Sequence, residues 1–356
     1  MKKKILSVLL SALCVTSLFT ACGSTTDTTA EETVAVEEEA VAESAESEDS
    51  VFPITIEHAF GETVIESQPE RVVTVGWCNE DALLALGIVP VGVSAANYGK
   101  VTDNMLHLWT ADAFAELGED NPNVFDDLTG LDYEAIAAAE PDIIVASYSG
   151  FSEEEYELLS EIAPVVPYLE EAWKTNWREQ TITNATAVGL KEEGEALVEE
   201  TDALIAEKLA DYPELEGKTA AFFWISADDM STFYAYLTAD PRAAYLNDLG
   251  LATPDSILAL EDEGNSFSVT ISRENTEMLN DVDIMVVYGD ESLLEAMQAD
   301  PLMSQIPAVA NGAVVLLDST TVLAASTTPS VLSIPYSIDE YLGALSEAAK
   351  KVDAAQ

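Results

Sequence analysis

Apolar runs and amphipathic segments alternate along most of the chain from Val51 onward, in two consecutive series. In the first series we predict buried strands at 72–75, 89–93, 143–146 and 165–167, with helices at 81–86 and 153–162. The second series has predicted strands at 219–225, 232–237, 284–288 and 313–317, helices at 242–249 and 293–298, and a closing helix at 330–350. Strands that alternate with helices are typical of a mainly parallel sheet covered by helices. The pattern therefore predicts two α/β lobes, at 52–176 and 213–356.

The segment between the two series, residues 177–212, contains no proline and has apolar residues at helical spacing. These include Val188, Leu197, Leu204 and Leu209, and acidic residues fill much of the remainder. Such spacing predicts one long amphipathic helix over 177–212. A helix of this length would connect the lobes stiffly; the alternative is an ordinary helix packed within one lobe.

A short stretch of sequence recurs at matching places in the two series. Residues 131–136 followed by 141–145 parallel residues 271–276 followed by 282–286. In each copy a short helix with a glutamate near its start, Glu134 or Glu274, leads to an aspartate and a buried strand. This internal similarity indicates that the two lobes are related.

The N-terminus has the pattern of an export signal. Three lysines at positions 2–4 precede an apolar run at 5–19, and the small residues Thr20 and Ala21 precede Cys22. We therefore predict a signal peptide at 1–21. The sequence before Cys22 resembles a bacterial lipobox, which implies cleavage before Cys22 and a lipid on its sulfur. An ordinary secretory peptide with an incidental cysteine is the alternative.

Residues 22–51 have the composition of a tether. They contain ten acidic residues, no basic residue and no aromatic residue. Such a composition buries too little apolar surface to fold, so we predict a disordered acidic tether. A lipid on Cys22 would then hold the folded lobes at the outer face of the cell membrane.

The overall charge excludes several classes of partner. The chain has 66 Asp and Glu against 14 Lys and Arg, a formal net charge of −52. Such a surface repels phosphate backbones, which argues against nucleic-acid binding. Two histidines, His58 and His107, are too few for a His-rich metal cage. Only Cys78 lies outside the leader, so no intramolecular disulfide framework can form.

Motifs for catalysis are weak. The sequence contains no glycine-rich nucleotide loop. The segment 92–96, centred on Ser94, resembles a nucleophile elbow but lacks the second glycine. A surface hydrolase is therefore the least favoured reading.

Aromatic residues follow several predicted strands. Trp77, Tyr148, Trp224 and Tyr288 each lie at or just after a strand end. Ligands of open α/β sheets bind outside the carboxyl ends of the strands, so these aromatics favour a lined cleft. Packing into the core is the alternative for each of them.

Further candidates lie in two segments beside these strand ends. Tyr98 and Trp109 fall within residues 95–127, a poorly periodic stretch whose length is typical of a functional loop. Tyr234 and Tyr236 precede Arg242, which stands at a predicted helix start. A cation there is locally unfavourable, so Arg242 is expected to meet an anionic partner. That partner is either a ligand or a neighbouring carboxylate.

Several motifs, taken in order, resemble the iron-siderophore substrate-binding lipoproteins of bacterial ABC importers. They are Pro-Glu-Arg-Val-Val at 69–73, Leu-Leu-Ala-Leu-Gly-Ile-Val-Pro at 83–90, Glu-Pro-Asp-Ile-Ile-Val at 140–145, the Asp-Pro-Arg stretch at 240–251, and Ile-Ser-Arg-Glu-Asn at 271–275. The resemblance runs from about residue 52 to the C-terminus. It implies a class III substrate-binding protein, with two Rossmann-like lobes joined by a single long α-helix. It also implies a monomer without catalytic residues or a cofactor.

The resemblance further implies a ferric siderophore in the cleft between the lobes, held by aromatic residues and arginine, with the iron bound by the siderophore rather than by protein ligands. The matching positions are Trp77, Tyr98, Trp109, Tyr148, Trp177, Trp224, Tyr234, Tyr236 and Arg242. Glu134 and Glu274 match surface glutamates that meet arginines on the dimeric permease of the membrane.

The acidic charge of the chain limits which class of siderophore is expected to bind. A ferric tris-catecholate carries about three negative charges and is disfavoured by an acidic surface, whereas ferric hydroxamates are neutral or cationic. We therefore expect a hydroxamate or mixed-type siderophore. Haem or a corrinoid is the alternative cargo, and haem would take His107 or Tyr98 as its axial ligand.

Overall fold

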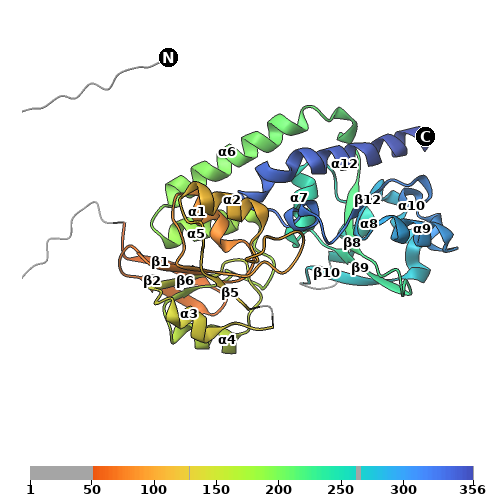
Figure 1. The fold of residues 1–356 in the computed structure, drawn as a ribbon. Coiled ribbons are helices and arrows are strands. Elements are labelled where there is room, and N and C mark those ends of the chain that lie inside the picture. Colours follow the sequence, from red (N-terminus) through yellow and green to blue (C-terminus); the bar gives the residue numbers. More distant parts are fainter. Residues whose placement is uncertain (1–50, 128, 262–265, 356) are drawn as a thin grey trace, which may run out of the picture. The chain divides into compact units, whose positions relative to one another are not determined.

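The computed structural model describes residues 51–127, 129–261 and 266–355, which all belong to one compact unit. The predicted signal peptide, Cys22 and all but the last residue of the predicted tether lie outside the described residues. The described part consists of two α/β lobes (Figure 1), which confirms the predicted fold class.

The first lobe is built on a five-stranded parallel sheet in the order β5-β4-β3-β6-β7. Its strands are β3 (Val72–Thr74), β4 (Gly92–Ser94), β5 (Val124–Phe125), β6 (Ile143–Val145) and β7 (Val165–Val166). An antiparallel hairpin of β1 (Ile54–His58) and β2 (Gly61–Ile65) precedes the sheet. The helices of this lobe are α1 (Asn79–Ala85), α2 (Leu108–Glu116), α3 (Tyr133–Ala138), α4 (Glu153–Ser160) and α5 (Trp177–Ala187).

The second lobe has a five-stranded mixed sheet in the order β10-β9-β8-β11-β12. Its strands are β8 (Ala220–Trp224), β9 (Thr232–Tyr236), β10 (Ser268–Ser272), β11 (Ile284–Tyr288) and β12 (Val314–Leu317). Strands β8, β11 and β12 are parallel, whereas β9 and β10 pair antiparallel. The helices are α7 (Pro241–Asp248), α8 (Asp255–Glu261), α9 (Glu291–Ala299), α10 (Pro307–Asn311), α11 (Val322–Ser326) and α12 (Ser333–Ala355), with 3₁₀ turns at Pro213–Leu215, Arg273–Asp281 and Met303–Gln305.

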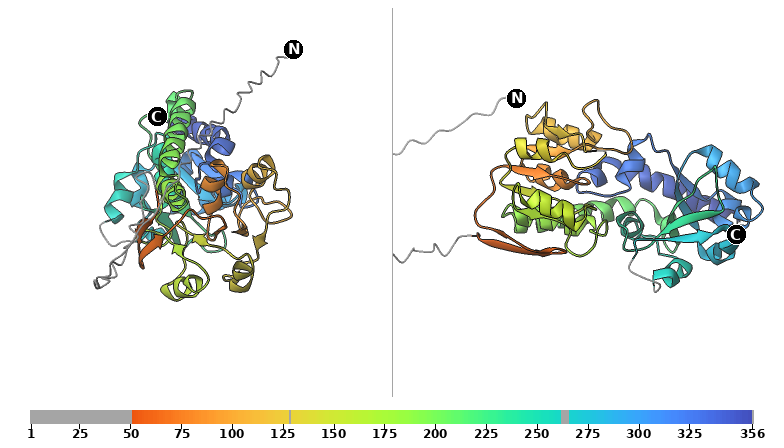
Figure 2. Two further views of the ribbon diagram at one scale, coloured as in Figure 1. Left: turned by 90° about the vertical axis from the view of Figure 1, so that its left-hand side faces the viewer. Right: turned by 90° about the horizontal axis from the view of Figure 1, so that it is seen from below.

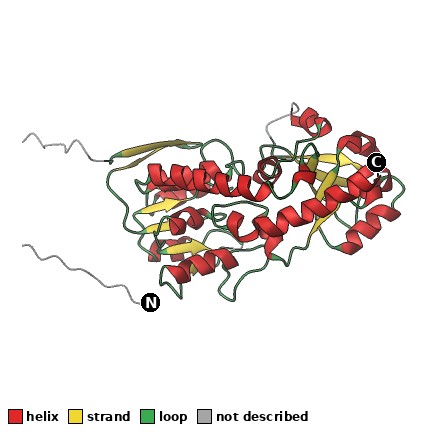
Figure 3. Cartoon of the chain, turned by 90° about the horizontal axis from the view of Figure 1, so that it is seen from above, coloured by secondary structure: helices red, strands yellow, loops and turns green. Residues whose placement is uncertain are grey.

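Figure 2 shows the two lobes next to each other, and Figure 3 shows helices packed around the strands of each. The central strands β3, β6, β8 and β11 are mostly buried, as the near-continuous apolar runs predicted, whereas β9 and β10 of the second sheet are only partly buried. Within the described residues, every helix is too short or too polar to cross a lipid bilayer.

The segment predicted as one helix over 177–212 forms two helices, so the predicted bounds were wrong. Helix α5 ends at Ala187, and α6 (Lys191–Leu209) begins after three intervening residues. Gly189 lies between them with a φ of +77°, a conformation that ends helices and favours glycine. Helix α5 packs against α1 of the first lobe, and α6 is the long helix that runs from one lobe to the other (Figure 1).

The stretch 95–127, predicted as a long loop, contains a helix and a strand. Helix α2 buries Phe114 against Leu84, Val93 and Leu106. Strand β5 has only two residues and extends the sheet beside β4. Both elements are short and the helix is rich in alanine, so the hydrophobic period is weak.

The internal similarity of the sequence has a structural counterpart. The Asp142 carboxylate, just before β6, accepts hydrogen bonds from the backbone N–H groups of Glu70 and Arg71, at 2.7 and 3.0 Å. In the second lobe the Asp283 carboxylate, just before β11, accepts one from the Thr219 N–H at 3.0 Å. In both lobes the aspartate therefore accepts hydrogen bonds from backbone N–H groups just before the central strand, β3 or β8, which would otherwise lack a partner.

Candidate functional site

A cavity of about 450 Å³ lies between the two lobes, and we call it the aromatic cavity. Both lobes contribute to its wall, which contains eight aromatic residues, one arginine and one threonine. The lining residues are Trp77, Tyr98, Tyr148 and Trp173 of the first lobe, Trp224, Tyr236, Arg242, Phe267 and Tyr288 of the second, and Thr328 of the segment before α12. The structure thus brings together six of the nine predicted ligand-binding residues.

Trp77 and Tyr148 reach the cavity because each follows the carboxyl end of a first-lobe strand. The Trp77 N–H donates to the Tyr148 carbonyl at 3.1 Å, which holds the two loops together. Gly76 precedes Trp77 with a φ of +94°, and a Cβ there would lie 2.6 Å from the Tyr148 carbonyl oxygen. Only glycine therefore allows this close approach of the two loops.

The buried side-chain amide of Asn79 also holds together the loops that carry Trp77 and Tyr148. The Asn79 side chain donates to the carbonyls of Val75 and Tyr148 at 2.8 and 3.0 Å, and its oxygen accepts from the Tyr148 N–H at 3.1 Å. Gln180 of α5 donates to the Trp77 carbonyl at 2.8 Å. Sequence reasoning missed both positioning residues, because a buried amide has no periodic signature.

The anionic partner of Arg242 is a neighbouring carboxylate, and Arg242 also lines the aromatic cavity. Its guanidinium binds the buried Asp240 carboxylate through Nε at 2.8 Å and through a terminal nitrogen at 2.6 Å. It also lies 4.0 Å from the ring centroid of Tyr236 in the cavity wall. Burial opposes the charged form, but the hydrogen bonds and charge of Asp240 outweigh it and raise the pKa of Arg242. The cavity therefore contains a cation whose charge is already balanced.

The Tyr98 and Tyr148 phenol groups of the wall stay neutral at physiological pH. Burial raises the pKa of Tyr98 and of Tyr148 well above the ordinary value. The Tyr98 ring meets the Tyr288 ring edge to face across the lobes, with centroids 5.4 Å apart. A wall of neutral rings with one compensated cation suits a large ligand of little net charge.

Two of the predicted ligand-binding tryptophans lie elsewhere, which corrects their expected placement. Trp109 is 2% exposed and donates from Nε1 to Asp81 at 2.8 Å. Trp177 is also 2% exposed and donates to Asp248 at 3.0 Å, where α5 meets α7 of the second lobe. A core tryptophan and a cavity tryptophan look alike in sequence, because burial depends on partners distant along the chain.

Tyr234 lies beside the aromatic cavity. It lines a shallower hollow of about 290 Å³ together with Trp224, Tyr236, Phe267 and Ser268. Trp224 and Tyr236 line both spaces, so Tyr234 stands at the rim of the site.

Sequence reasoning did not find Trp173, Phe267 or Thr328. All three lie in irregular segments, where hydrophobic periodicity gives no signal. Trp173 has a φ of +63°, which is rare for a bulky residue, and its ring packs directly on Gly150. Such strain persists only where the surroundings impose it and is common in ligand sites.

His107, one of the two candidate haem ligands, and Ser94, the candidate for hydrolysis, have other surroundings. Burial lowers the pKa of His107 to about 4, and the ring stacks on Trp109 with centroids 4.4 Å apart. Ser94 donates its hydroxyl hydrogen to Asp127 at 2.5 Å and not to a histidine. Neither residue lines the aromatic cavity as the described residues define it.

Comparison with known proteins identifies a matching protein family and a similar solved structure. Residues 72–321 match a protein family described as periplasmic binding protein. The crystal structure of PiaA from Streptococcus pneumoniae TIGR4 in complex with ferrichrome is 46% identical in sequence, with a TM-score of 0.81. The match covers 84% of this chain and 99% of that chain.

Two curated proteins are similar at lower identity. The Fe(3+) dicitrate-binding periplasmic protein FecB of Escherichia coli (strain K12) is 26% identical over 275 residues, covering 76% of this chain and 84% of FecB. The probable siderophore-binding lipoprotein YfiY of Bacillus subtilis (strain 168) is 25% identical over 239 residues, covering 66% of this chain and 67% of YfiY.

Proposed function

Because the chain belongs to the periplasmic binding protein family, we propose that it is the extracytoplasmic component of an ABC importer that captures a ferric siderophore in the aromatic cavity. The family comprises substrate-binding proteins of transporters and is not a family of enzymes. The observation that carries the proposal is the cavity itself, in which rings from both lobes surround a charge-balanced arginine.

The ligand we propose is a ferric hydroxamate. Arg242 is the one cation among the described residues that line the aromatic cavity, and Asp240 neutralises it. A ferric tris-catecholate would bring about three uncompensated negative charges into this wall, at a high desolvation cost. A neutral ferric trihydroxamate carries no such cost. The similarity to PiaA in its ferrichrome complex supports this choice.

Delivery requires a membrane anchor and a permease. We propose that a lipid on Cys22 provides the anchor and that Glu134 and Glu274 contact the two halves of the permease dimer. Both glutamates are exposed and stand at equivalent places, each at the start of a short helix that leads to the aspartate before a central strand. Two equivalent carboxylates suit a two-fold symmetric partner.

Titration of the purified chain tests the ligand class. Tryptophan fluorescence is followed while ferrichrome, a ferric tris-catecholate or haemin is added. We expect saturable quenching by ferrichrome, affinity for the tris-catecholate lower by at least about tenfold, and no Soret shift with haemin. Tighter binding of the tris-catecholate, or a haemin complex with a shifted Soret band, would contradict the proposal.

A further inference from the structure

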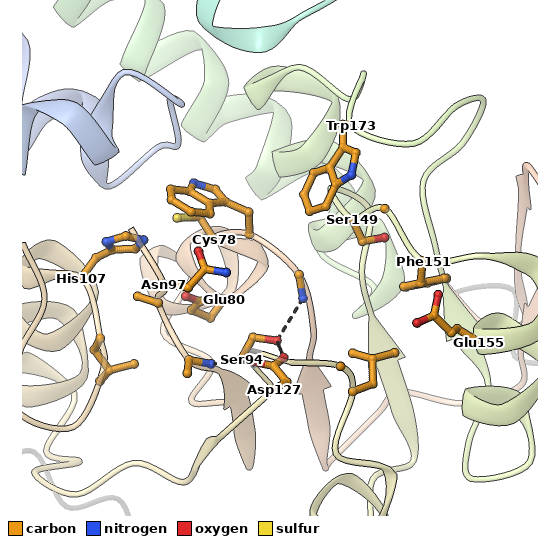
Figure 4. A pocket seen from close by; sticks show the side chains of 18 residues that line it. Cys78, Glu80, Ser94, Asn97, His107, Asp127, Ser149, Phe151, Glu155 and Trp173 are labelled. Atoms are coloured by element: carbon orange, nitrogen blue, oxygen red, sulfur yellow. Dashed lines mark hydrogen bonds between the residues drawn. The ribbon is translucent and has the colours of Figure 1, made fainter. Parts of the chain in front are cut away.

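The first lobe contains a second cavity beside the aromatic cavity, with a volume of about 260 Å³, and we call it the polar chamber. Its wall includes Glu80, Ser94, Asn97, His107 and Asp127 (Figure 4). Trp77 and Trp173 line both cavities, so the two spaces adjoin at these rings. A ligand in the aromatic cavity would therefore lie next to the polar chamber.

The wall of the polar chamber is rich in hydrogen-bond acceptors. The Ser94 hydroxyl gives its hydrogen to Asp127 and accepts from the Gly76 N–H at 3.0 Å, so it has no hydrogen left for a ligand. Glu80, 5% exposed, accepts from the Thr74 hydroxyl at 3.3 Å. Among the described residues that line the chamber, none is a lysine or an arginine. The carboxyl groups of Glu80, Asp127 and Glu155 thus lack a cationic partner in the wall.

His107 gives an independent indication of a polar ligand. The residue is 3% exposed, and its Nδ1 has no hydrogen-bond partner among the described residues. Buried polar atoms are almost always hydrogen-bonded, so an unpartnered nitrogen on a side chain that lines a cavity points to a ligand. The low pKa of His107 keeps the ring neutral, with one nitrogen free to accept a hydrogen bond.

We propose that the polar chamber is a second subsite, which binds a cationic, hydrogen-bond-donating arm of the siderophore, namely a primary ammonium group. This inference rests on the proposed function, because it places the iron chelate in the aromatic cavity. An ammonium group has three donors and no acceptor, which complements the carboxyl oxygens of Glu80 and Asp127 and the imidazole of His107. A buried carboxylate is stabilised when a cation pairs with it. The chamber is smaller than the aromatic cavity, which suits an alkylammonium arm rather than the chelate.

The test uses two ligands with the same iron chelate. Ferrioxamine B carries a pendant primary ammonium group, and its N-acetyl derivative carries a neutral amide there. Binding is measured at about pH 8.5 by tryptophan quenching, because burial and the neighbouring Asp81 raise the pKa of Glu80 to about 8. We expect the wild-type chain to bind ferrioxamine B at least about tenfold more tightly than the derivative.

Substitutions assign this preference to the chamber. Glu80→Gln and Asp127→Asn should each reduce the preference for ferrioxamine B over its N-acetyl derivative at least severalfold. Glu134→Gln removes an exposed carboxylate of the same lobe and should keep the preference. Far-ultraviolet circular dichroism checks that each variant is folded. Because there are two chamber variants, the test can still be made if one of them does not fold.

The outcomes separate the two proposals. Equal affinity of wild type for the two ferrioxamines, or an undiminished preference in both folded chamber variants, would contradict the polar subsite and leave the aromatic site intact. Binding of ferrichrome without either ferrioxamine would also contradict the subsite. Failure of all three ferric hydroxamates to bind would overturn the proposed function itself.

Discussion

At the scale of single residues, the position of Trp77 depends on the glycine before it. Gly76 combines a positive φ with a close approach to the Tyr148 carbonyl, so any side chain there must displace one of the two loops. Gly87 also has a positive φ, of +78°, but an added Cβ would meet no described atom within 4 Å. A substitution at Gly87 therefore tests backbone strain alone, whereas one at Gly76 tests strain together with crowding beside the cavity.

We predict that Gly76→Ala lowers the free energy of unfolding by about 2–4 kcal/mol, because strain at a positive φ adds to overpacking. It should also weaken ferrichrome binding at least about tenfold. Gly87→Ala should cost only about 1 kcal/mol and leave binding unchanged. Urea unfolding and fluorescence titration measure both quantities; equal effects of the two substitutions would contradict this account.

Glu80 should make stability depend on pH. Burial and the nearby Asp81 carboxyl raise its pKa from 4.5 to about 8 in the folded chain. Between these values the folded state keeps a proton that the unfolded chain has released, so the contribution of Glu80 to stability is lost as the pH rises. The amide of Glu80→Gln does not titrate, so this variant lacks the pH-dependent loss of stability.

We therefore predict that Glu80→Gln becomes more stable relative to wild type as the pH rises from about 4.5 to about 8. The gap in unfolding free energy should widen by as much as about 1.4 kcal/mol for each pH unit. Urea unfolding at several pH values measures it. A gap independent of pH would show that the Glu80 carboxyl does not titrate as proposed.

At the scale of secondary-structure elements, α5 is joined to the second lobe by a cluster of polar side chains. The Asp248 carboxylate of α7 accepts from Trp177 Nε1 and from both terminal nitrogens of Arg178, all at 3.0 Å. Arg178 also binds Asp202 of α6. Because Gln180 of the same helix holds the Trp77 carbonyl, α5 connects this inter-lobe contact to the cavity wall.

We predict that Asp248→Ala lowers the free energy of unfolding by about 1–3 kcal/mol, because the buried Trp177 N–H loses its acceptor. Asp202→Ala removes only a partly exposed ion pair and should cost at most about 1 kcal/mol. Thermal or urea unfolding of the two variants gives the comparison. A larger loss for Asp202→Ala would contradict the assigned role of Asp248.

The sequence predicted those elements whose signal is local. Strand β11 occupies the predicted residues 284–288, because a short run of apolar residues fits a buried strand. The break at Gly189 is not evident in the sequence, because the segment 177–212 contains no proline and its apolar spacing predicts one helix. Strand-end reasoning found Trp77, Tyr148 and Trp224, since topology alone places such residues at one edge of a sheet. Trp173 and Phe267 depend on irregular backbone, which periodicity does not describe.

At the scale of the whole molecule, the two lobes present equivalent carboxylates, Glu134 and Glu274, for the proposed permease contact. We predict that the double variant Glu134→Ala, Glu274→Ala binds ferrichrome as the wild type does. Uptake of radioactive iron as ferrichrome by cells that depend on this chain should fall at least about tenfold. The control is Glu153→Ala with Glu291→Ala, which removes one surface carboxylate from the first turn of a helix in each lobe. Normal uptake by the first double variant would contradict the proposed docking.

The most direct measurement for the central claim is the position of iron in crystals grown with ferrichrome, found by anomalous scattering at the iron edge. The account predicts one strong peak inside the aromatic cavity, between Trp77 and Tyr148 of the first lobe and Trp224 and Arg242 of the second. A peak outside this cavity, or none in crystals of a chain saturated with ferrichrome, would contradict it.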